Sequence, residues 1–145
     1  SFAHLSSRRQ QKQALAAIRA HLAPGGLFIL DISNADVRYM ESLSGQVLHQ
    51  GTWPREDGTL LTHFVSPASS TTLHLLELTH FYDAHTQGGP LQRTAITTHL
   101  YLFERAETEL LLERAGFALK EVYGDYELGP YEHESPRMIF LAEAG

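Results

Sequence analysis

The segment from Ser7 to Ser33 constrains the fold most, because it predicts a helix, a turn and a buried strand in immediate succession. Between Ser7 and Leu22, apolar residues recur at spacings of three and four among Gln, Lys and Arg, which is the pattern of an amphipathic helix capped by Ser6 or Ser7. The letters APGG then end the helix, since Pro24 cannot continue it and glycine permits the turn. The run LFILDIS that follows is typical of a strand buried on both faces of a parallel sheet.

The central part of the chain predicts an antiparallel meander that follows a short helix over residues 34–43. Its strand-like runs are rich in Thr, Leu, Val and aromatic residues, and the turns REDG, SPASS and HTQGGP separate them. The four runs cover residues 46–53, 60–65, 73–82 and 93–103. In the third run alternate side chains point to opposite faces, and both faces mix apolar and polar residues. One face is therefore expected to cover a ligand or another layer.

The C-terminal part returns to helical spacing in RAETELLLERAGF, where Gly116 supplies the stop. Two further strands are predicted over residues 118–123 and 138–142, joined by the loop GDYELGPYEHESPR. The expected order is helix, strand, meander, helix, strand, strand. Parallel-type layers at both ends of the chain would thus enclose an antiparallel insertion.

Composition limits the class of partner. The 145 residues favour one domain, and 43% hydrophobic with 19% charged residues is ordinary for a globular protein. A net charge of -6 argues against a nucleic-acid partner, because phosphate-backbone binding needs a field of Lys and Arg. There is no cysteine, so disulfides and thiolate sites are excluded and a cytoplasmic location is expected. The run LFIL is too short to span a membrane, so no membrane partner is expected.

Four stretches in this order resemble the C-terminal part of a class I S-adenosylmethionine-dependent methyltransferase. They are SFAHL before the first helix, LAPGGLFILDI, LFERAETELLLERAGF, and VYGDY followed by SPRMIFLAE. The resemblance implies an α/β fold, or α+β for a fragment: the C-terminal half of a Rossmann-like sheet with an inserted antiparallel meander. Residues 1–43 and 104–145 would form part of the core, and residues 44–103 would form the substrate-covering insertion of small-molecule N-methyltransferases.

The sequence departs from this family in its cofactor motif. It has no G-x-G-x-G turn after a first strand and no acidic residue after a second, and these elements build the nucleotide crevice of such sheets. Three missing strand–helix units and one more strand would amount to roughly a hundred residues. The chain therefore resembles a fragment that alone binds S-adenosylmethionine poorly or not at all.

By this resemblance, the first residues of the chain lie beside the cofactor and the acceptor atom. Ser1 and Phe2 would contact the cofactor, and His4 would be the catalytic base that takes a proton from the acceptor, since its unperturbed pKa is near neutrality. The alternative for His4 is an exposed histidine at a frayed end. A methyltransferase needs little more than this, because alignment of nucleophile and methyl group supplies most of the catalysis.

Five further residues are candidates for substrate binding. Asp31 would orient a substrate amine or act as a solvated or helix-capping acid, and Arg137 would bind a substrate carboxylate or hold the loop before the last strand. Tyr39 is a pocket or packing residue on the short helix. Tyr101 and Phe103 alternate with leucines, so that one pair faces the core and the other lines the insertion.

The nine histidines do not predict a metal site. Four of them, His63, His74, His80 and His99, fall in the meander, but no H-x-x-x-H or H-E-x-x-H spacing occurs. His74 and His80 are expected on one strand face, about 20 Å apart at the rise of a strand. We therefore predict no metal.

The first functional hypothesis is a fragment of an S-adenosylmethionine-dependent methyltransferase that acts on a small molecule, at nitrogen, and is inactive alone. The alternative is a non-catalytic α+β module that binds a small ligand or dimerises. If LFIL is made to lie inside a sheet, its exposed edge is also expected to drive a homodimer or a domain-swapped assembly.

Overall fold

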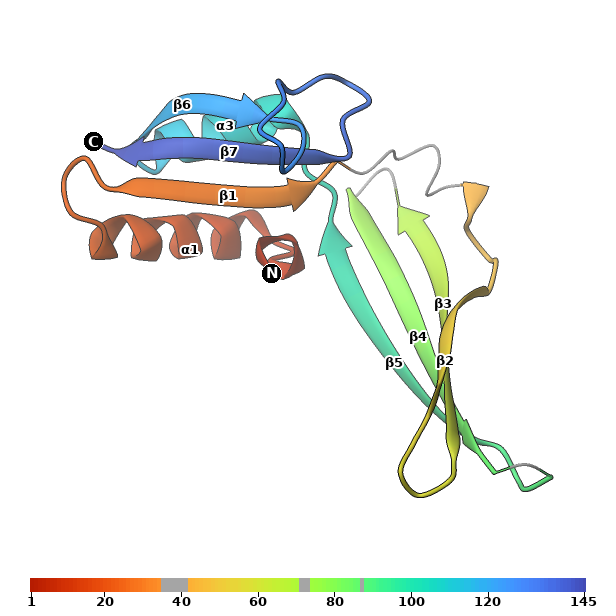
Figure 1. Cartoon of the computed structure of the whole chain (residues 1–145). Coiled ribbons are helices and arrows are strands. Elements are labelled where there is room, and N and C mark those ends of the chain that lie inside the picture. Colours follow the sequence, from red (N-terminus) through yellow and green to blue (C-terminus); the bar gives the residue numbers. More distant parts are fainter. Residues whose placement is uncertain (35–41, 71–73, 87) are drawn as a thin grey trace. The chain divides into compact units, whose positions relative to one another are not determined.

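The computed structural model describes residues 1–34, 42–70, 74–86 and 88–145, and it divides the chain into two compact units. Unit 1 comprises Ser1–Asp36 and Tyr101–Gly145, and unit 2 comprises Val37–Leu100. Figure 1 labels their elements. Unit 1 contains a 3-10 turn at Phe2–His4, α1 (Arg8–His21), β1 (Leu27–Ser33), α3 (Arg105–Arg114), β6 (Phe117–Tyr123) and β7 (Arg137–Ala144). The remaining strands are β2 (Leu48–Pro54), β3 (Leu60–Ser70), β4 (Leu75–His85) and β5 (Gln92–Tyr101).

Local signals set the limits of the two described helices as the sequence predicts. Ser7 caps α1: its Oγ accepts from the Gln10 amide at 3.3 Å, and the Gln10 side chain accepts from the Ser7 amide, which completes a capping box. α3 ends before Gly116, whose φ of +85° is a conformation that glycine adopts without strain. The predicted short helix over residues 34–43 lies almost wholly outside the described residues.

The sheet of unit 1 has the order β1-β7-β6, and both strand pairs are antiparallel. The expectation of parallel-type layers at both ends, with LFIL buried on both faces, is therefore wrong for the chain as described. The register places Leu30 opposite Phe140 on one face of the sheet, so that Leu27 and Ile29 lie on the other. Leu27 is 59% exposed and Ile29 is 63% exposed.

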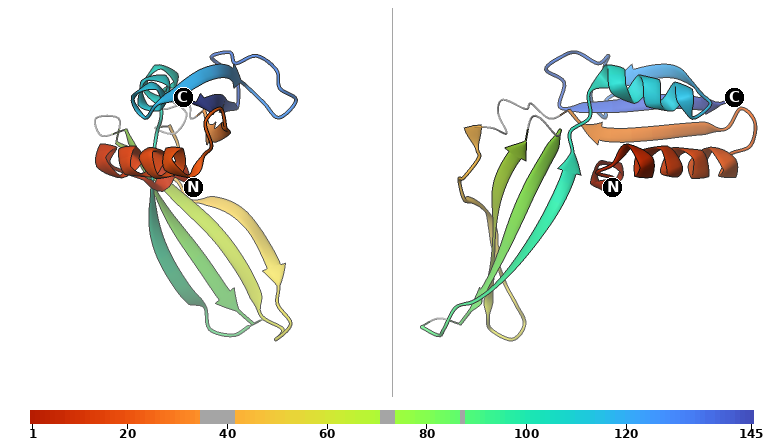
Figure 2. Two further views of the ribbon diagram at one scale, coloured as in Figure 1. Left: turned by 90° about the vertical axis from the view of Figure 1, so that its left-hand side faces the viewer. Right: turned by 180° about the vertical axis from the view of Figure 1, so that it is seen from behind.

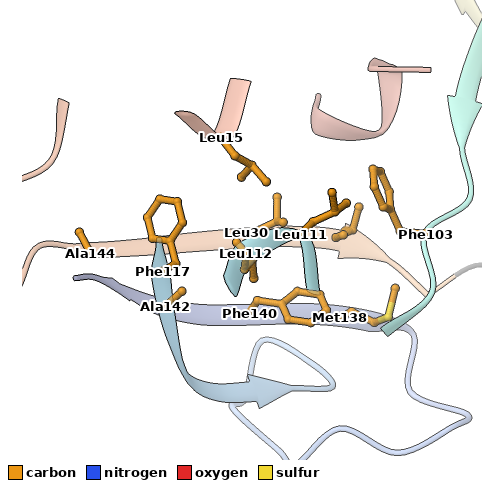
Figure 3. Packing of buried hydrophobic residues seen from close by; sticks show 11 residues of the cluster. Leu15, Leu30, Phe103, Leu111, Leu112, Phe117, Met138, Phe140, Ala142 and Ala144 are labelled. Atoms are coloured by element: carbon orange, nitrogen blue, oxygen red, sulfur yellow. The ribbon is translucent and has the colours of Figure 1, made fainter. Parts of the chain in front are cut away.

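The core of unit 1 lies on the face of the sheet that the two helices cover. Leu15 of α1 and Leu112 of α3 have no exposed surface, and both belong to one cluster with Leu30, Met138 and Phe140 of the sheet. Figure 3 shows these side chains converging from the helices and strands, and Figure 2 shows α1 and α3 on the same side of the sheet. Burial of this cluster supplies the main stabilisation of the unit.

Unit 2 is a sheet of order β2-β3-β4-β5, which confirms the predicted meander. Two details differ from the prediction. SPASS is part of β3 rather than a turn. Pro67 is tolerated because it lies beyond the β2 pairing, which ends at Val65, and there its carbonyl accepts from the Gly45 amide while no ladder bond from its own nitrogen is needed. His74 lies before β4, in a turn with φ +51°, so it does not share a strand with His80.

Candidate functional site

Two sequence-predicted residues, Asp31 and Arg137, meet at the carboxyl end of β1. The β1–β7 register places Ser33 opposite Arg137, and the Arg137 Nε donates to Asp31 Oδ1 at 2.6 Å. The second carboxylate oxygen accepts from the Tyr126 hydroxyl at 3.0 Å, while the Arg137 guanidinium lies 5.1 Å from the centre of the Tyr126 ring. The three side chains form what we call the Asp31 cluster.

Charge and hydrogen bonding set the protonation states in this cluster. The hydrogen bond to Asp31 raises the pKa of the Tyr126 hydroxyl, so that the phenol stays protonated and keeps donating. The same carboxylate raises the pKa of Arg137. Because Asp31 and Arg137 side chains are 34% and 27% exposed, the cluster is accessible to a ligand. A ligand with a hydrogen-bond donor that enters there meets a carboxylate whose position is already fixed.

The loop between β6 and β7 is tied to the same strand end. The Asn34 side chain donates to the carbonyl oxygens of Ser135 at 2.7 Å and His133 at 3.0 Å. Gly124 closes the loop: its amide donates to the Gly129 carbonyl, and a Cβ added there would lie 2.8 Å from the Ser135 Cβ. The loop that carries Tyr126 is thus anchored at both ends, which positions the phenol over Asp31.

The N-terminal turn lies near the carboxyl end of β1 in both Figure 1 and Figure 2. Ser1 and His4 are exposed, and the His4 amide donates to the Ser1 carbonyl at 3.1 Å. Phe2 is half-buried, and its ring lies 5.3 Å from that of Phe103. The turn therefore presents His4 to solvent while Phe2 holds it against the core.

Aromatic rings continue from Phe2 into the core of unit 1. Phe103 is 6% exposed and packs 4.7 Å from Tyr101, so it supports its two neighbours and has little surface of its own for a ligand. The Tyr101 hydroxyl donates to Glu107 at 2.7 Å. Burial, followed by this carboxylate, raises the pKa of Tyr101 to about 12, so the phenol is neutral at physiological pH. Tyr39, the remaining candidate, lies outside the described residues.

Unit 2 contains a second polar group, on one face of its sheet. His63 Nε2 and His80 Nδ1 are 3.0 Å apart, and His80 Nε2 lies 3.2 Å from the Thr98 hydroxyl. The Tyr82 ring stacks on His63 at 4.5 Å with an angle of 5°. Burial, and then the neighbouring His80, lowers the pKa of His63, so this histidine is neutral near pH 7. These four side chains offer hydrogen-bonding groups and one aromatic ring surface to a ligand.

Within residues 1–34, 42–70, 74–86 and 88–145, no group of three or more His, Cys, Asp or Glu side chains is arranged to hold a metal ion. No helix in the described part of the chain is long and apolar enough to cross a membrane.

Sequence reasoning missed Tyr126, Asn34 and the pairing of His63 with His80. Tyr126 lies 95 positions from Asp31, and its only signal was a loop rich in Gly, Pro and Tyr. His63 and His80 are on neighbouring strands, and only the β3–β4 register, with His63 opposite Tyr82, reveals their contact.

Comparison with known proteins identifies the fold. No protein-family model and no curated protein sequence matches this chain. Solved structures do match it. An S-adenosylmethionine-dependent methyltransferase from Clostridium acetobutylicum aligns over 100% of the chain with a TM-score of 0.77 and 15% identity. An amino pentose methyltransferase from Micromonospora echinaspora (TM-score 0.70, 20% identity) and a sugar N-methyltransferase from Streptoalloteichus (TM-score 0.73, 17% identity) each align over 99% of it.

These alignments cover 55%, 54% and 52% of the three matched proteins. The chain therefore spans about half the length of the structures it resembles. Its fold is that of part of an S-adenosylmethionine-dependent methyltransferase, with two antiparallel sheets and two described helices.

Proposed function

We propose that this chain supplies the acceptor side of an S-adenosylmethionine-dependent methyltransferase that modifies nitrogen in a small molecule. The observation that carries the proposal is the placement of Asp31 and Arg137 at the carboxyl end of β1, the edge at which open α/β sheets bind ligands. The similarity to an amino pentose and a sugar N-methyltransferase favours a small polar acceptor.

The described residues do not fit a nucleotide cofactor. Binding of such a cofactor in this type of sheet uses a glycine-rich turn from strand to helix. The described connection from β5 to α3 consists of Leu102, Phe103 and Glu104, has no glycine, and buries its first two side chains. In this proposal the cofactor site is supplied by another part of a longer enzyme, and this chain alone is inactive.

The chemistry assigned to this chain is acceptor binding and proton handling. Asp31 would accept a hydrogen bond from the protonated amine of the acceptor, and the hydrogen bond from Arg137 would orient that carboxylate. His4, exposed on the N-terminal turn, would take the proton that makes the nitrogen nucleophilic. Ser1 and Phe2 would border the cofactor, and Tyr101 would contact the acceptor.

A thermal-shift experiment tests this proposal. S-adenosylhomocysteine would be added to this chain and to the product of the full reading frame that contains it. We expect stabilisation of the longer product only, because a ligand stabilises the fold to which it binds. If the longer product is stabilised no more than this chain, the methyltransferase proposal fails. A His4→Ala variant of the longer product should bind the cofactor normally and lose kcat.

The exposed face of β1 favours self-association as a second property of this chain. Leu27 and Ile29 are more than half exposed, and β7 is the only neighbour of β1 in the described sheet. β1 is an edge strand of this sheet, and an edge strand can pair with a second strand, which would also cover its exposed apolar side chains. We expect a homodimer or a domain-swapped assembly in the cytoplasm. Light scattering that shows only monomer at micromolar concentration would contradict this expectation, and Leu27→Lys should restore the monomer if it is correct.

A further inference from the structure

A recess between α1 and α3 lies on the helical side of unit 1, away from the sheet face that carries Asp31. Two contacts hold the helices side by side: Arg8 pairs with Glu107 near their N-terminal ends, and Arg19 Nε donates to the Gly116 carbonyl at 3.3 Å near their C-terminal ends. Between these contacts the recess has a volume of about 390 Å³. Its lining residues are Arg8, Lys12, Glu107, Leu110, Leu111 and Arg114.

The recess is cationic although the chain is acidic. Three lining residues are Lys or Arg and one is Glu, which leaves a local charge of +2 against -6 for the whole chain. The single carboxylate, Glu107, is already engaged by Arg8 and by the Tyr101 hydroxyl. Among the described residues, Lys12 and Arg114 have no ion-pair partner within 4.0 Å, so their charge is available to a ligand.

The first turns of α1 carry charges that the helix itself disfavours. Arg8 and Arg9 begin the helix, Lys12 follows four positions after Arg8, and no acid lies in the first turn. The positive end of the helix dipole repels cations, and like charges four residues apart repel each other. Glu107 offsets the charge of Arg8, whereas Lys12 has no ion-pair partner among the described residues, and departures from local rules are expected at functional sites. A bound anion would offset the repulsion of these cations by the helix dipole and by one another.

Two leucines also line the recess. Leu110 is 54% exposed and sits one helical turn from both Glu107 and Arg114, and Leu111 is 5% exposed. The recess thus combines a charged rim with an exposed leucine, in a volume within the range of small-molecule pockets, about 300–1,000 Å³. A ligand that fits both features has an anionic group and a short apolar part.

We propose that this recess binds a small phosphate monoester whose phosphate group is held by Lys12 and Arg114 and whose apolar part lies on Leu110. The charge of such an ester at pH 7, about -1.5 to -2, matches the local charge of the recess. Arg114 presents a fork of N–H donors suited to phosphate oxygens, and Lys12 supplies a point charge. This site is independent of the acceptor and cofactor sites proposed above.

Calorimetric titration of this chain with phenyl phosphate and with inorganic phosphate tests the proposal. The test variant is K12Q/R114Q, and the matched control R9Q/R55Q removes the same amount of charge from positions that do not line the recess. We expect K12Q/R114Q to weaken binding of phenyl phosphate about tenfold or more and the control to change it less than about twofold. Equal weakening in both variants would overturn the proposal, because binding would then follow net charge alone.

Two further measurements distinguish binding of the ester from binding of free phosphate, and loss of binding from misfolding of a variant. Leu110→Ser, at an exposed position, should weaken binding of phenyl phosphate and leave that of inorganic phosphate unchanged. Amide chemical-shift changes in the unmodified chain should centre on Lys12, Leu110 and Arg114, which keeps the test valid if a variant fails to fold. Shift changes elsewhere, dissociation constants above about 10 mM, or binding only of an acidic peptide would each overturn the proposal.

Discussion

Replacement of Asp31 and Arg137 by alanine, singly and together, measures whether the Asp31 cluster holds the structure of the strand end. Charge-assisted hydrogen bonds contribute about 1.5–3 kcal/mol when buried. Here the contact of 2.6 Å joins side chains that are 27% and 34% exposed, so solvent screening reduces the expected coupling to about 1–1.5 kcal/mol. The double-mutant cycle isolates this coupling from the lost packing of Arg137 on Tyr126.

The assay is urea unfolding at pH 7 followed by far-UV circular dichroism, with the Arg105–Glu109 pair as the control. That pair has a similar distance, 2.7 Å, but is 45% and 31% exposed on one helix, where pairs couple by about 0.3–0.5 kcal/mol. We expect the Asp31–Arg137 coupling to be at least about twice that of the control. Equal couplings would refute the reasoning, because the strand-end contact would then be an ordinary surface ion pair.

Three other outcomes follow from the contacts described above. Phe140→Ala should lower the free energy of unfolding by about 3–5 kcal/mol, since its side chain has no exposed surface in the core, and a loss below about 1 kcal/mol in urea unfolding would speak against that packing. The raised pKa of Tyr101 means that the unfolded chain loses this proton first, so stability should fall as pH rises from 10 to about 12, and the Tyr101→Phe variant should lack that part of the slope in a pH series. The pKa of His63 in the folded chain is lowered from 6.5, so the unfolded chain binds a proton on this side chain more readily. Stability should therefore fall as pH drops below 6.5. A His63→Gln variant whose stability falls just as steeply with acid would show that His80 or another group is responsible.

Local order was predictable because local rules dictate it. The Ser7 cap and the Gly116 stop each depend on a few neighbouring residues, and the structure has both. SPASS was misread as a turn because Pro and Ser favour turns, whereas the pairing of Pro67 with Leu78 across β3 and β4 continues the strand. Tertiary pairing overrides such local preference.

The candidate site was predictable one residue at a time but not as a set. Asp31 and Arg137 were each singled out, yet they are 106 positions apart, and their contact depends on the register of β1 against β7. Tyr126 joins them only because Asn34 and Gly124 anchor its loop. The exposure of Ile29 likewise depends on which face the helices cover, and a continuous apolar run does not contain that information.

Transfer of a labelled methyl group to nitrogen is the direct readout of the proposal that this chain forms the acceptor side of an N-methyltransferase. The product of the full reading frame would be incubated with S-adenosylmethionine labelled on its methyl group and with a panel of small amines, including amino sugars. We expect the label to move to the nitrogen of one class of amine, and Asp31→Asn to raise the KM for that amine. Tight binding of the cofactor with no transfer to any nitrogen, or with transfer only to oxygen, would contradict it.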